Sequence, residues 1–233
     1  MMEQEKKRDR VYAVFQRIST TYDAANLRIS LGLERRWKAR LVQSVLAEAE
    51  GHSQFLDVCC GTGDIALAMA AARPDVTVTG LDFSPAMLEV AARKGRACSN
   101  VAWRQGDAMD LPFQDDTFRG AVISFGLRNT ADYGQVLQEM RRVVKPGGRV
   151  YCLDSFVPDS PVIRPFYTAY FRCLMPLLGG GWQHRREYQW LWKSTQEFLR
   201  KDELMTLFQQ AGLHGVQAES FLFGACVLHS GQK

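Results

Sequence analysis

The chain has 233 residues, of which 46% are hydrophobic and 23% charged, and its formal net charge is +4. This composition is typical of a globular protein and excludes a disordered, collagen-like or disulfide-scaffold chain. The 29 basic residues are scattered in short clusters instead of gathering on one face, so no nucleic-acid partner is expected. No run reaches the ~18 apolar residues of a membrane span, and the first ten residues lack the apolar segment of a secretory signal. We therefore expect a cytoplasmic protein.

Residues 1–50 predict a helical cap at the N-terminus. Val11, Val14, Phe15 and Ile18 recur at helical spacing, and residues 33–49 predict a second helix with few breakers. A polar run over residues 19–23 separates the two helices. We expect this cap to belong to a single domain that spans residues 1–233.

Residues 54–153 alternate between strand and helix patterns. Helices are predicted over 65–72, over 84–97 with Ser84 as cap, and over 133–144, stopped by the Lys-Pro-Gly-Gly run at 145–148. Strands are predicted over 55–59, 76–81, 101–105, 119–125 and 149–153. Strands that alternate with helices predict an α/β fold, in which a parallel sheet is covered on both faces.

Residues 155–198 interrupt this alternation with an aromatic-rich stretch that contains three consecutive glycines at 179–181. Long excursions of this kind usually carry function, so we interpret the segment as a lid over an acceptor site. A plain helical connection packed on the core is the alternative. A helix over 202–211 and two strands near 214–220 and 222–229 complete the chain.

A glycine-rich loop follows the first predicted strand in the sequence DVCCGTGD, residues 57–64. Gly61 and Gly63 allow a tight turn and a close approach of the backbone to a ligand, and the next helix offers free N–H groups at its start. Asp57 and Asp64 would repel a pyrophosphate and favour a cationic or zwitterionic ligand. The loop therefore favours S-adenosylmethionine over NAD.

Two further acidic residues end strands next to this loop. Asp82 closes the second predicted strand, where a carboxylate can accept hydrogen bonds from both hydroxyls of a ribose. Asp107 follows the third strand and can accept from an adenine amine, while the N–H of Ala108 can donate to a ring nitrogen. Ligands of open α/β sheets bind at these carboxyl ends.

Several segments together resemble the ubiquinone/menaquinone biosynthesis C-methyltransferase family, a family of class I S-adenosylmethionine-dependent enzymes. The resemblance lies in DVCCGTGD, GLDFSPAML, GDAMDLPFQDDTF, ISFGLRN and EMRRVVKPGGRV, and in FQRISTTYDAANLRISLGLERRWKARLV near the N-terminus. It implies a Rossmann-like sheet of seven strands, the last antiparallel, with helices on both faces. Together with the arguments above, it assigns nine residues to the cofactor: Asp57, Gly61, Thr62, Gly63, Asp82, Phe83, Asp107, Ala108 and Ser124.

The reaction that the resemblance implies is transfer of a methyl group from a sulfonium to a ring carbon of a prenylated quinol. No metal is required, because the sulfonium already activates the methyl group. Arg128 is the first candidate for stabilising a phenolate, because a guanidinium stays charged. A structural fork to backbone carbonyls or to Asp132 is its alternative. Asp154 and His184 are candidate bases, and Tyr22 is expected to order the site.

The segment over residues 182–199 departs from the family pattern. Tryptophans enter at Trp190 and Trp192 and a family proline is absent after Phe198, where the acceptor is expected to bind. The acceptor therefore stays open between a benzoquinol, a naphthoquinol and another aromatic small molecule that would be methylated on oxygen or nitrogen. A non-enzymatic scaffold role in quinone synthesis is a third hypothesis.

The expected partners are a lipophilic quinol substrate and, transiently, the inner face of the membrane. The helical spacing of Val162, Phe166, Tyr170 and Leu174 fits an interfacial helix. The same spacing fits an ordinary core helix. The choice between a monomer and a homodimer stays open.

Overall fold

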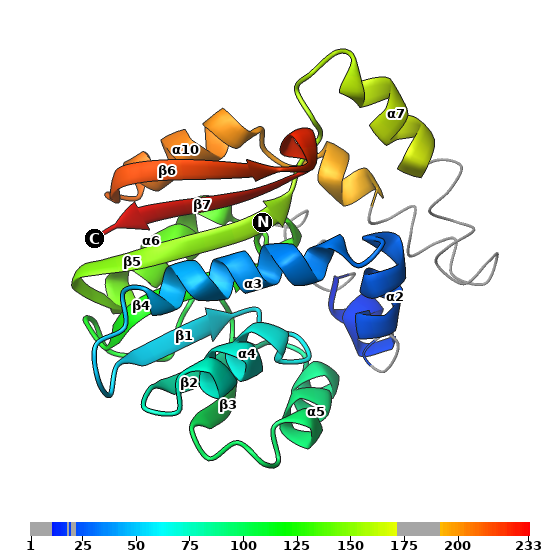
Figure 1. Ribbon diagram of the computed structural model, residues 1–233. Helices are drawn as coiled ribbons and strands as arrows, with labels where there is room; N and C mark the ends of the chain where they lie inside the picture. The colour runs from blue at the N-terminus through cyan, green and yellow to red at the C-terminus, as the bar shows by residue number, and fades with distance from the viewer. Residues whose placement is uncertain (1–10, 18, 20–21, 172–191) are drawn as a thin grey trace.

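The computed structural model describes residues 11–17, 19, 22–171 and 192–233, and Figure 1 shows how their elements are arranged. The candidate base His184, Leu174 of the candidate interfacial helix and Trp190 lie outside the described residues.

A seven-stranded sheet forms the centre of the molecule. Its spatial order is β3-β2-β1-β4-β5-β7-β6, and β7 pairs antiparallel with both of its neighbours while the other paired strands are parallel. This arrangement confirms the fold that the resemblance implies. The strands are β1 (Gln54–Val58), β2 (Thr77–Asp82), β3 (Val101–Gln105), β4 (Phe118–Ser124), β5 (Val144–Ser155), β6 (His214–Phe221) and β7 (Cys226–Gln232).

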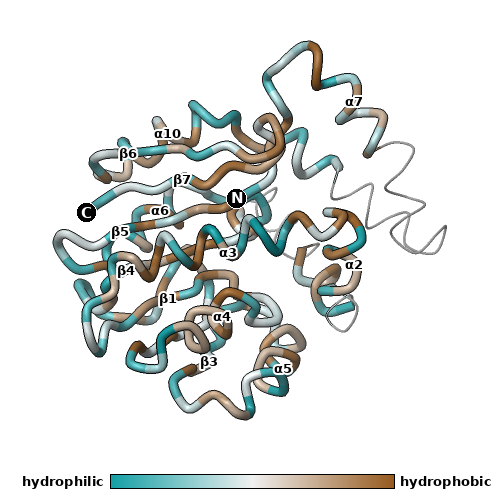
Figure 2. The backbone as a smooth tube through the Cα atoms, in the orientation of Figure 1, coloured by the Kyte–Doolittle hydropathy of each residue, from teal (hydrophilic) through white to brown (hydrophobic). Residues whose placement is uncertain are grey.

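Helices cover both faces of the sheet (Figure 1). α3 (Leu33–Leu46) and α4 (Asp64–Ala72) bury apolar side chains in one core with β1, β2, β4 and β5. α6 (Tyr133–Val143) and α10 (Lys201–Gln210) build the second core on the opposite face. α5 (Pro85–Lys94) lies against β2 and β3. The tube in Figure 2 is mostly apolar along β1 and β4, as expected for strands that are buried on both faces.

Local signals predicted some helix ends correctly and others wrongly. The Ser84 hydroxyl accepts a hydrogen bond from the N–H of Met87 at 3.3 Å, which confirms the predicted cap of α5. That helix ends at Lys94 rather than near residue 97, because the N–H of Gly95 closes its last turn on Ala91. The predicted helix over 33–49 ends at Leu46.

Three other predictions fail where tertiary pairing overrides local pattern. The polar run over 19–23 is not a simple break, because α2 (Tyr22–Ile29) begins inside it. The Lys-Pro-Gly-Gly run does not separate helix from strand, since β5 already starts at Val144, which pairs with Phe118. The last strand starts at Cys226 instead of 222, because Leu222 and Phe223 adopt positive φ in a short 3-10 turn.

Of the expected lid, the structure describes residues 155–171 and 192–198, which include α7 (Ile163–Ala169). No residue of this helix is buried, so the ordinary core-helix interpretation is wrong for it. Val162 and Phe166 are 69% and 72% exposed, and the apolar start of α7 stands away from the sheet in Figure 2. None of the described helices has both the length and the apolar character needed to cross a membrane.

Candidate active site

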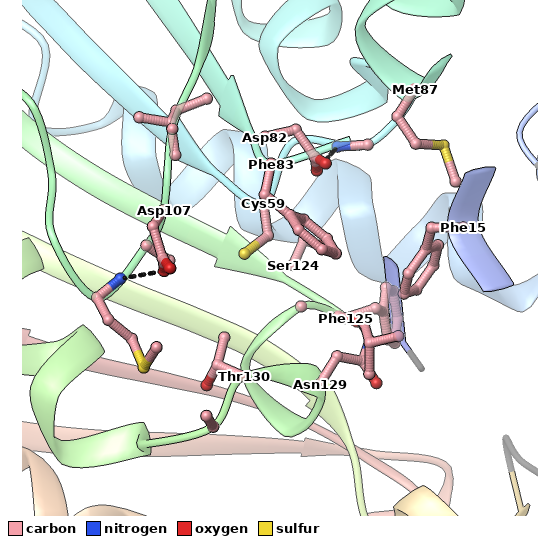
Figure 3. Close-up of a pocket in the computed structure, with 18 of the residues that line it drawn as sticks. Phe15, Cys59, Asp82, Phe83, Met87, Asp107, Ser124, Phe125, Asn129 and Thr130 are labelled. Atoms are coloured by element: carbon pink, nitrogen blue, oxygen red, sulfur yellow. Dashed lines mark hydrogen bonds between the residues drawn. The ribbon is translucent and has the colours of Figure 1, made fainter. Parts of the chain in front are cut away.

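A cavity opens at the carboxyl ends of β1, β2, β3 and β4. The order of the sheet reverses between β1 and β4, which is where ligands of open α/β folds bind. Figure 3 shows side chains from all four strand ends turned toward this space, which we call the cofactor cavity. Its wall contains six of the nine predicted cofactor residues: Gly61, Asp82, Phe83, Asp107, Ala108 and Ser124.

Asp82 is held by backbone donors at the centre of the cofactor cavity. Its two carboxylate oxygens accept from the N–H of Gly61 at 2.8 Å and from that of Ser84 at 2.9 Å. Burial raises the pKa of Asp82, and the backbone hydrogen bonds oppose that effect. Each oxygen keeps a second lone pair, so the carboxylate can still accept from the two hydroxyls of a ribose.

The glycine loop is shaped by the residues beneath it. Gly61 and Gly63 have φ of 54° and 83°, and a Cβ on Gly63 would meet the Trp103 ring at 2.4 Å. Asp57 lies buried below the loop and accepts from the N–H of Ala66 at 3.0 Å. Burial raises its pKa to about 8, so the side chain is largely protonated at neutral pH.

Three predicted cofactor residues therefore do not appear in the described wall of the cavity: Asp57, Thr62 and Gly63. Asp57 lies in β1 beneath the loop, while Thr62 and Gly63 belong to the loop itself. Thr62 donates from its hydroxyl to the carboxylate of Asp23 at 2.6 Å, which ties the loop to α2. A direct contact of these three residues with the cofactor stays a prediction.

Polar atoms in the cavity wall fit an adenosyl ligand. Asp107 accepts from the N–H of Met109 at 2.9 Å, which fixes its carboxylate at the end of β3 (Figure 3). Ser124 Oγ and Asn129 Oδ1 are buried and find no hydrogen-bond partner among the described residues. Buried polar groups normally have partners, so these atoms indicate a ligand that supplies them.

The N-terminal cap closes the cofactor cavity from outside the sheet. Val11, Phe15 and Tyr22 all contribute to the wall, and Figure 3 shows Phe15 on a separate helix that faces Met87. Asp23 also pairs with Lys94 of α5 at 2.8 Å. The sequence predicted the helical cap, but it did not predict α2, which begins inside the polar run over 19–23.

The backbone is strained at two points in the cavity wall. Cys59 and Phe125 have φ of 55° and 54°, which side-chain-bearing residues rarely adopt. They directly follow β1 and β4, the two strands at which the order of the sheet reverses. Strain of this kind persists where the surroundings enforce it, typically at ligand sites. Burial raises the pKa of the Cys59 thiol well above its usual value, so this thiol stays protonated.

A second, larger cavity of about 420 Å³ adjoins the first. We call it the acceptor cavity, and it shares Tyr22 and Phe125 with the cofactor cavity. Its wall comes from five separated regions of the chain. The residues are Tyr22, Asn26, Ile29, Ser30, Leu31, Leu33, Glu34, Trp37, Phe125, Arg128, Ser155, Pro158, Ile163, Phe166, Tyr167, Tyr170, Phe171, Thr195, Leu222, Phe223 and Ala225. The wall is therefore mainly apolar and aromatic.

Arg128 supplies the positive charge in this wall. It is 5% exposed and forms a buried ion pair with Asp154. Burial lowers the pKa of the guanidinium, but the Asp154 carboxylate, with smaller effects of Tyr22 and Tyr167, brings the pKa above its usual value. Arg128 Nε has no hydrogen-bond partner among the described residues. The predicted alternative partner, Asp132, instead caps α6 by accepting from Gln135.

The remaining predicted catalytic residues occupy different positions. Asp154 is fully buried and also accepts from the N–H of Ser155 at 2.8 Å. It belongs to neither described cavity wall, so the geometry assigns it to holding Arg128 rather than to contact with the acceptor. Tyr22 lies between the two cavities, and burial raises its pKa. The role of His184 stays a prediction outside the described residues.

Comparisons with known proteins agree with this site. The model of the ubiE/COQ5 methyltransferase family matches residues 2–233. A demethylmenaquinone methyltransferase of Staphylococcus carnosus is 43% identical over 235 aligned positions, which cover 100% of this chain and 97% of that protein. The corresponding protein of Staphylococcus aureus strain JH9 is 42% identical, with the same coverage of both chains.

Solved structures share the fold at lower identity. A SAM-dependent methyltransferase from Thermotoga maritima superposes with a TM-score of 0.65 at 20% identity, over 96% of this chain and 99% of that one. The full-length family match, the cofactor cavity and the fold lead to one assignment. The chain belongs to the ubiE/COQ5 methyltransferase family and is an S-adenosylmethionine-dependent methyltransferase.

Proposed function

We propose that the chain methylates a ring carbon of a prenylated naphthoquinol, the reduced form of a demethylmenaquinone. The observation that carries this proposal is the pair of adjoining cavities that share Tyr22 and Phe125, with the buried charge of Arg128 in the second. The names of the staphylococcal relatives, at 42–43% identity over the whole chain, favour the naphthoquinol over a benzoquinol.

The chemistry requires the reacting ring carbon to face the methyl donor. When bound, S-adenosylmethionine supplies a methyl group on a positively charged sulfur. The ring carbon forms a bond to the methyl carbon as the carbon–sulfur bond breaks, and that electron pair stays on sulfur. The same carbon then gives up its proton to solvent water, and the electron pair of that C–H bond makes the ring aromatic again. The enzyme must hold the two carbons in line at roughly 3–3.5 Å.

Arg128 supports this chemistry by its position and its charge. The ring carbon is more nucleophilic when the neighbouring hydroxyl has lost its proton, and a phenol has a pKa of about 10. A guanidinium beside that oxygen favours the phenolate, and it acts strongly because the acceptor cavity is mainly apolar. Asp154 keeps the guanidinium fixed from behind.

The mouth of the acceptor cavity suits a substrate with a lipid tail. Leu31, Phe166, Leu222 and Phe223 line this cavity, and each is at least half exposed. With Val162, they are five of the six exposed large hydrophobic side chains of the described residues. We propose that this apolar rim rests on the membrane surface while the prenyl tail passes through it.

The proposed reaction is tested with labelled S-adenosylmethionine and two reduced, short-tailed acceptors, a demethylated naphthoquinol and a methoxybenzoquinol. We expect kcat/KM to be higher for the naphthoquinol by at least tenfold. A preference for the benzoquinol would show that the proposed naphthoquinol is not the substrate. Intact cofactor binding without transfer to either ring would overturn the quinol assignment.

The apolar rim is tested by sedimentation with anionic phospholipid vesicles. The double variant Phe166→Ser, Phe223→Ser should bind vesicles less than the wild type. A matched double variant at exposed charged positions, Glu203→Ser and Lys145→Ser, should bind as the wild type does. Equal binding by all three proteins would contradict the proposed contact.

A further inference from the structure

Tyr167 places a hydroxyl group in the acceptor cavity that no other described residue satisfies. The residue lies on α7, and its side chain lines the cavity together with Arg128. Its hydroxyl oxygen is buried without a hydrogen-bond partner among the described residues. Leaving such a group unpaired costs free energy, so a buried hydroxyl in a ligand cavity indicates a bond that forms with the ligand.

The ring of Tyr167 is held firmly by its aromatic neighbours. The centroid of the Tyr167 ring lies 4.6 Å from that of Phe171 and 6.0 Å from that of Trp192. Phe171 and Trp192 also contact each other, at 5.1 Å between centroids. A side chain locked in this way presents its hydroxyl in a fixed direction, which is a property of groups that orient a substrate.

Tyr170, directly after α7, is a neighbouring tyrosine whose hydroxyl does have a partner. Tyr170 also lines the acceptor cavity, but its hydroxyl donates to the backbone carbonyl of Ile29 in α2. Tyr170 therefore links the segment after α7 to the cap. Tyr167 has no such structural bond in the described residues, and a purely structural role leaves its hydroxyl unexplained.

The electrostatic surroundings determine which way the hydrogen bond runs. Burial raises the pKa of the Tyr167 hydroxyl, and the nearby Arg128 charge lowers it by a smaller amount. The hydroxyl therefore keeps its proton at neutral pH and acts as a donor. Arg128 Nε is a second donor without a described partner in the same wall. Two donors in the wall of a mainly apolar cavity match one oxygen that carries negative charge.

We propose that the hydroxyl of Tyr167 donates a hydrogen bond to the acceptor oxygen beside the reacting carbon, next to Arg128. Tyr167 is then a substrate-binding residue that orients the ring and stabilises the phenolate. This inference rests on the proposed function, since it needs an acceptor with a ring oxygen. It adds a specificity element that selects hydroxylated rings over rings without that oxygen.

The test uses the variant Tyr167→Phe, which keeps the aromatic contacts and removes the hydroxyl alone. With the short-tailed naphthoquinol, we expect kcat/KM to fall about tenfold, the equivalent of one hydrogen bond. The acid limb of the kcat–pH profile should move to higher pH, because the bound hydroxyl loses a group that stabilises its ionised form. The affinity for S-adenosylmethionine and the melting temperature should not change.

A matched control is Tyr151→Phe, which removes a tyrosine hydroxyl from the core. Tyr151 donates to the carbonyl of Ser44 at 3.2 Å and belongs to neither described cavity wall. This variant should keep the kcat/KM and the pH profile of the wild type. A fall equal to that of Tyr167→Phe would show that the effect is a general loss of packing and would overturn the inference.

A binding measurement separates this inference from the proposed function. Calorimetry with S-adenosylhomocysteine present compares the naphthoquinol with an analogue that lacks the hydroxyl beside the reacting carbon. The wild type should bind the naphthoquinol about tenfold more tightly, and Tyr167→Phe should lose that preference. Equal preferences in both proteins would overturn the inference. Binding with the expected preference but without methyl transfer would overturn the proposed function alone.

Discussion

Replacing Asp154 by alanine breaks its buried ion pair with Arg128, and this loss should both destabilise the fold and abolish methyl transfer. The carboxylate is fully buried and accepts from Arg128 and from the N–H of Ser155. In Asp154→Ala, the guanidinium of Arg128 stays buried without its counter-charge. Breaking one partner of a buried pair typically costs about 3–5 kcal/mol.

The expected change in thermal stability follows from the size of the chain. For proteins of roughly 150–250 residues, each kcal/mol shifts the melting temperature by about 2–4 °C. Asp154→Ala should therefore melt about 6–20 °C below the wild type. Thermal unfolding followed by circular dichroism, with and without S-adenosylmethionine, measures the shift.

A double variant separates charge from packing. Arg128→Met with Asp154→Leu replaces the pair by apolar side chains of similar size, which is often close to neutral for stability. We expect it to melt above Asp154→Ala and to bind S-adenosylmethionine, but to lose methyl transfer because the charge in the acceptor cavity is gone. If Asp154→Ala melts within about 2 °C of the wild type, the variant does not leave the Arg128 charge buried and uncompensated, and the reasoning is refuted. A double variant with wild-type activity would remove Arg128 from the proposed chemistry.

Three further predictions follow from the structure. Asp82→Ala should weaken the binding of S-adenosylmethionine by about 100-fold in calorimetry, since two hydrogen bonds to a charged acceptor are lost; a change below threefold would refute a ribose contact. Asp23→Asn should weaken it by less than about fivefold, because its pairing with Lys94 is partly exposed; a 100-fold loss would make the cap far more important than its contacts indicate. His229 is buried, and burial lowers its pKa to about 4, so stability should fall as the pH drops from about 6.5 to 4, where only the unfolded chain gains this proton. Urea unfolding of His229→Gln should show a smaller loss over that interval, and an unchanged profile would contradict the assignment.

The parallel sheet could be predicted from the sequence because its signals are local. Buried apolar runs that alternate with helical periods specify βαβ units without any knowledge of distant contacts. The cap at Ser84 was found for the same reason, since it depends on residues within one turn. Residues that follow the strands, such as Asp82 and Asp107, were placed in the cofactor cavity because parallel strands share one carboxyl edge.

The acceptor cavity could not be predicted in this way. Its wall combines α2 and α3 with Arg128, the region of α7, and the turn at Leu222 and Phe223, which are far apart in the sequence. α2 carries no buried residue and no strong apolar period, so its position depends on contacts such as Thr62 with Asp23. The pairing of Arg128 with Asp154 could have been predicted, because Asp154 lies at the end of β5, the strand next to β4, and Arg128 shortly follows β4.

The central claim is that the chain transfers a methyl group to a ring carbon. The most direct measurement uses S-adenosylmethionine with a deuterated methyl group, a reduced short-tailed demethylnaphthoquinol, and nuclear magnetic resonance of the purified product. We expect one deuterated methyl group on the ring carbon next to the tail, with both ring oxygens unmethylated. A deuterated methyl group on a ring oxygen would contradict it and show that the acceptor cavity directs the oxygen, not the carbon, toward the methyl donor.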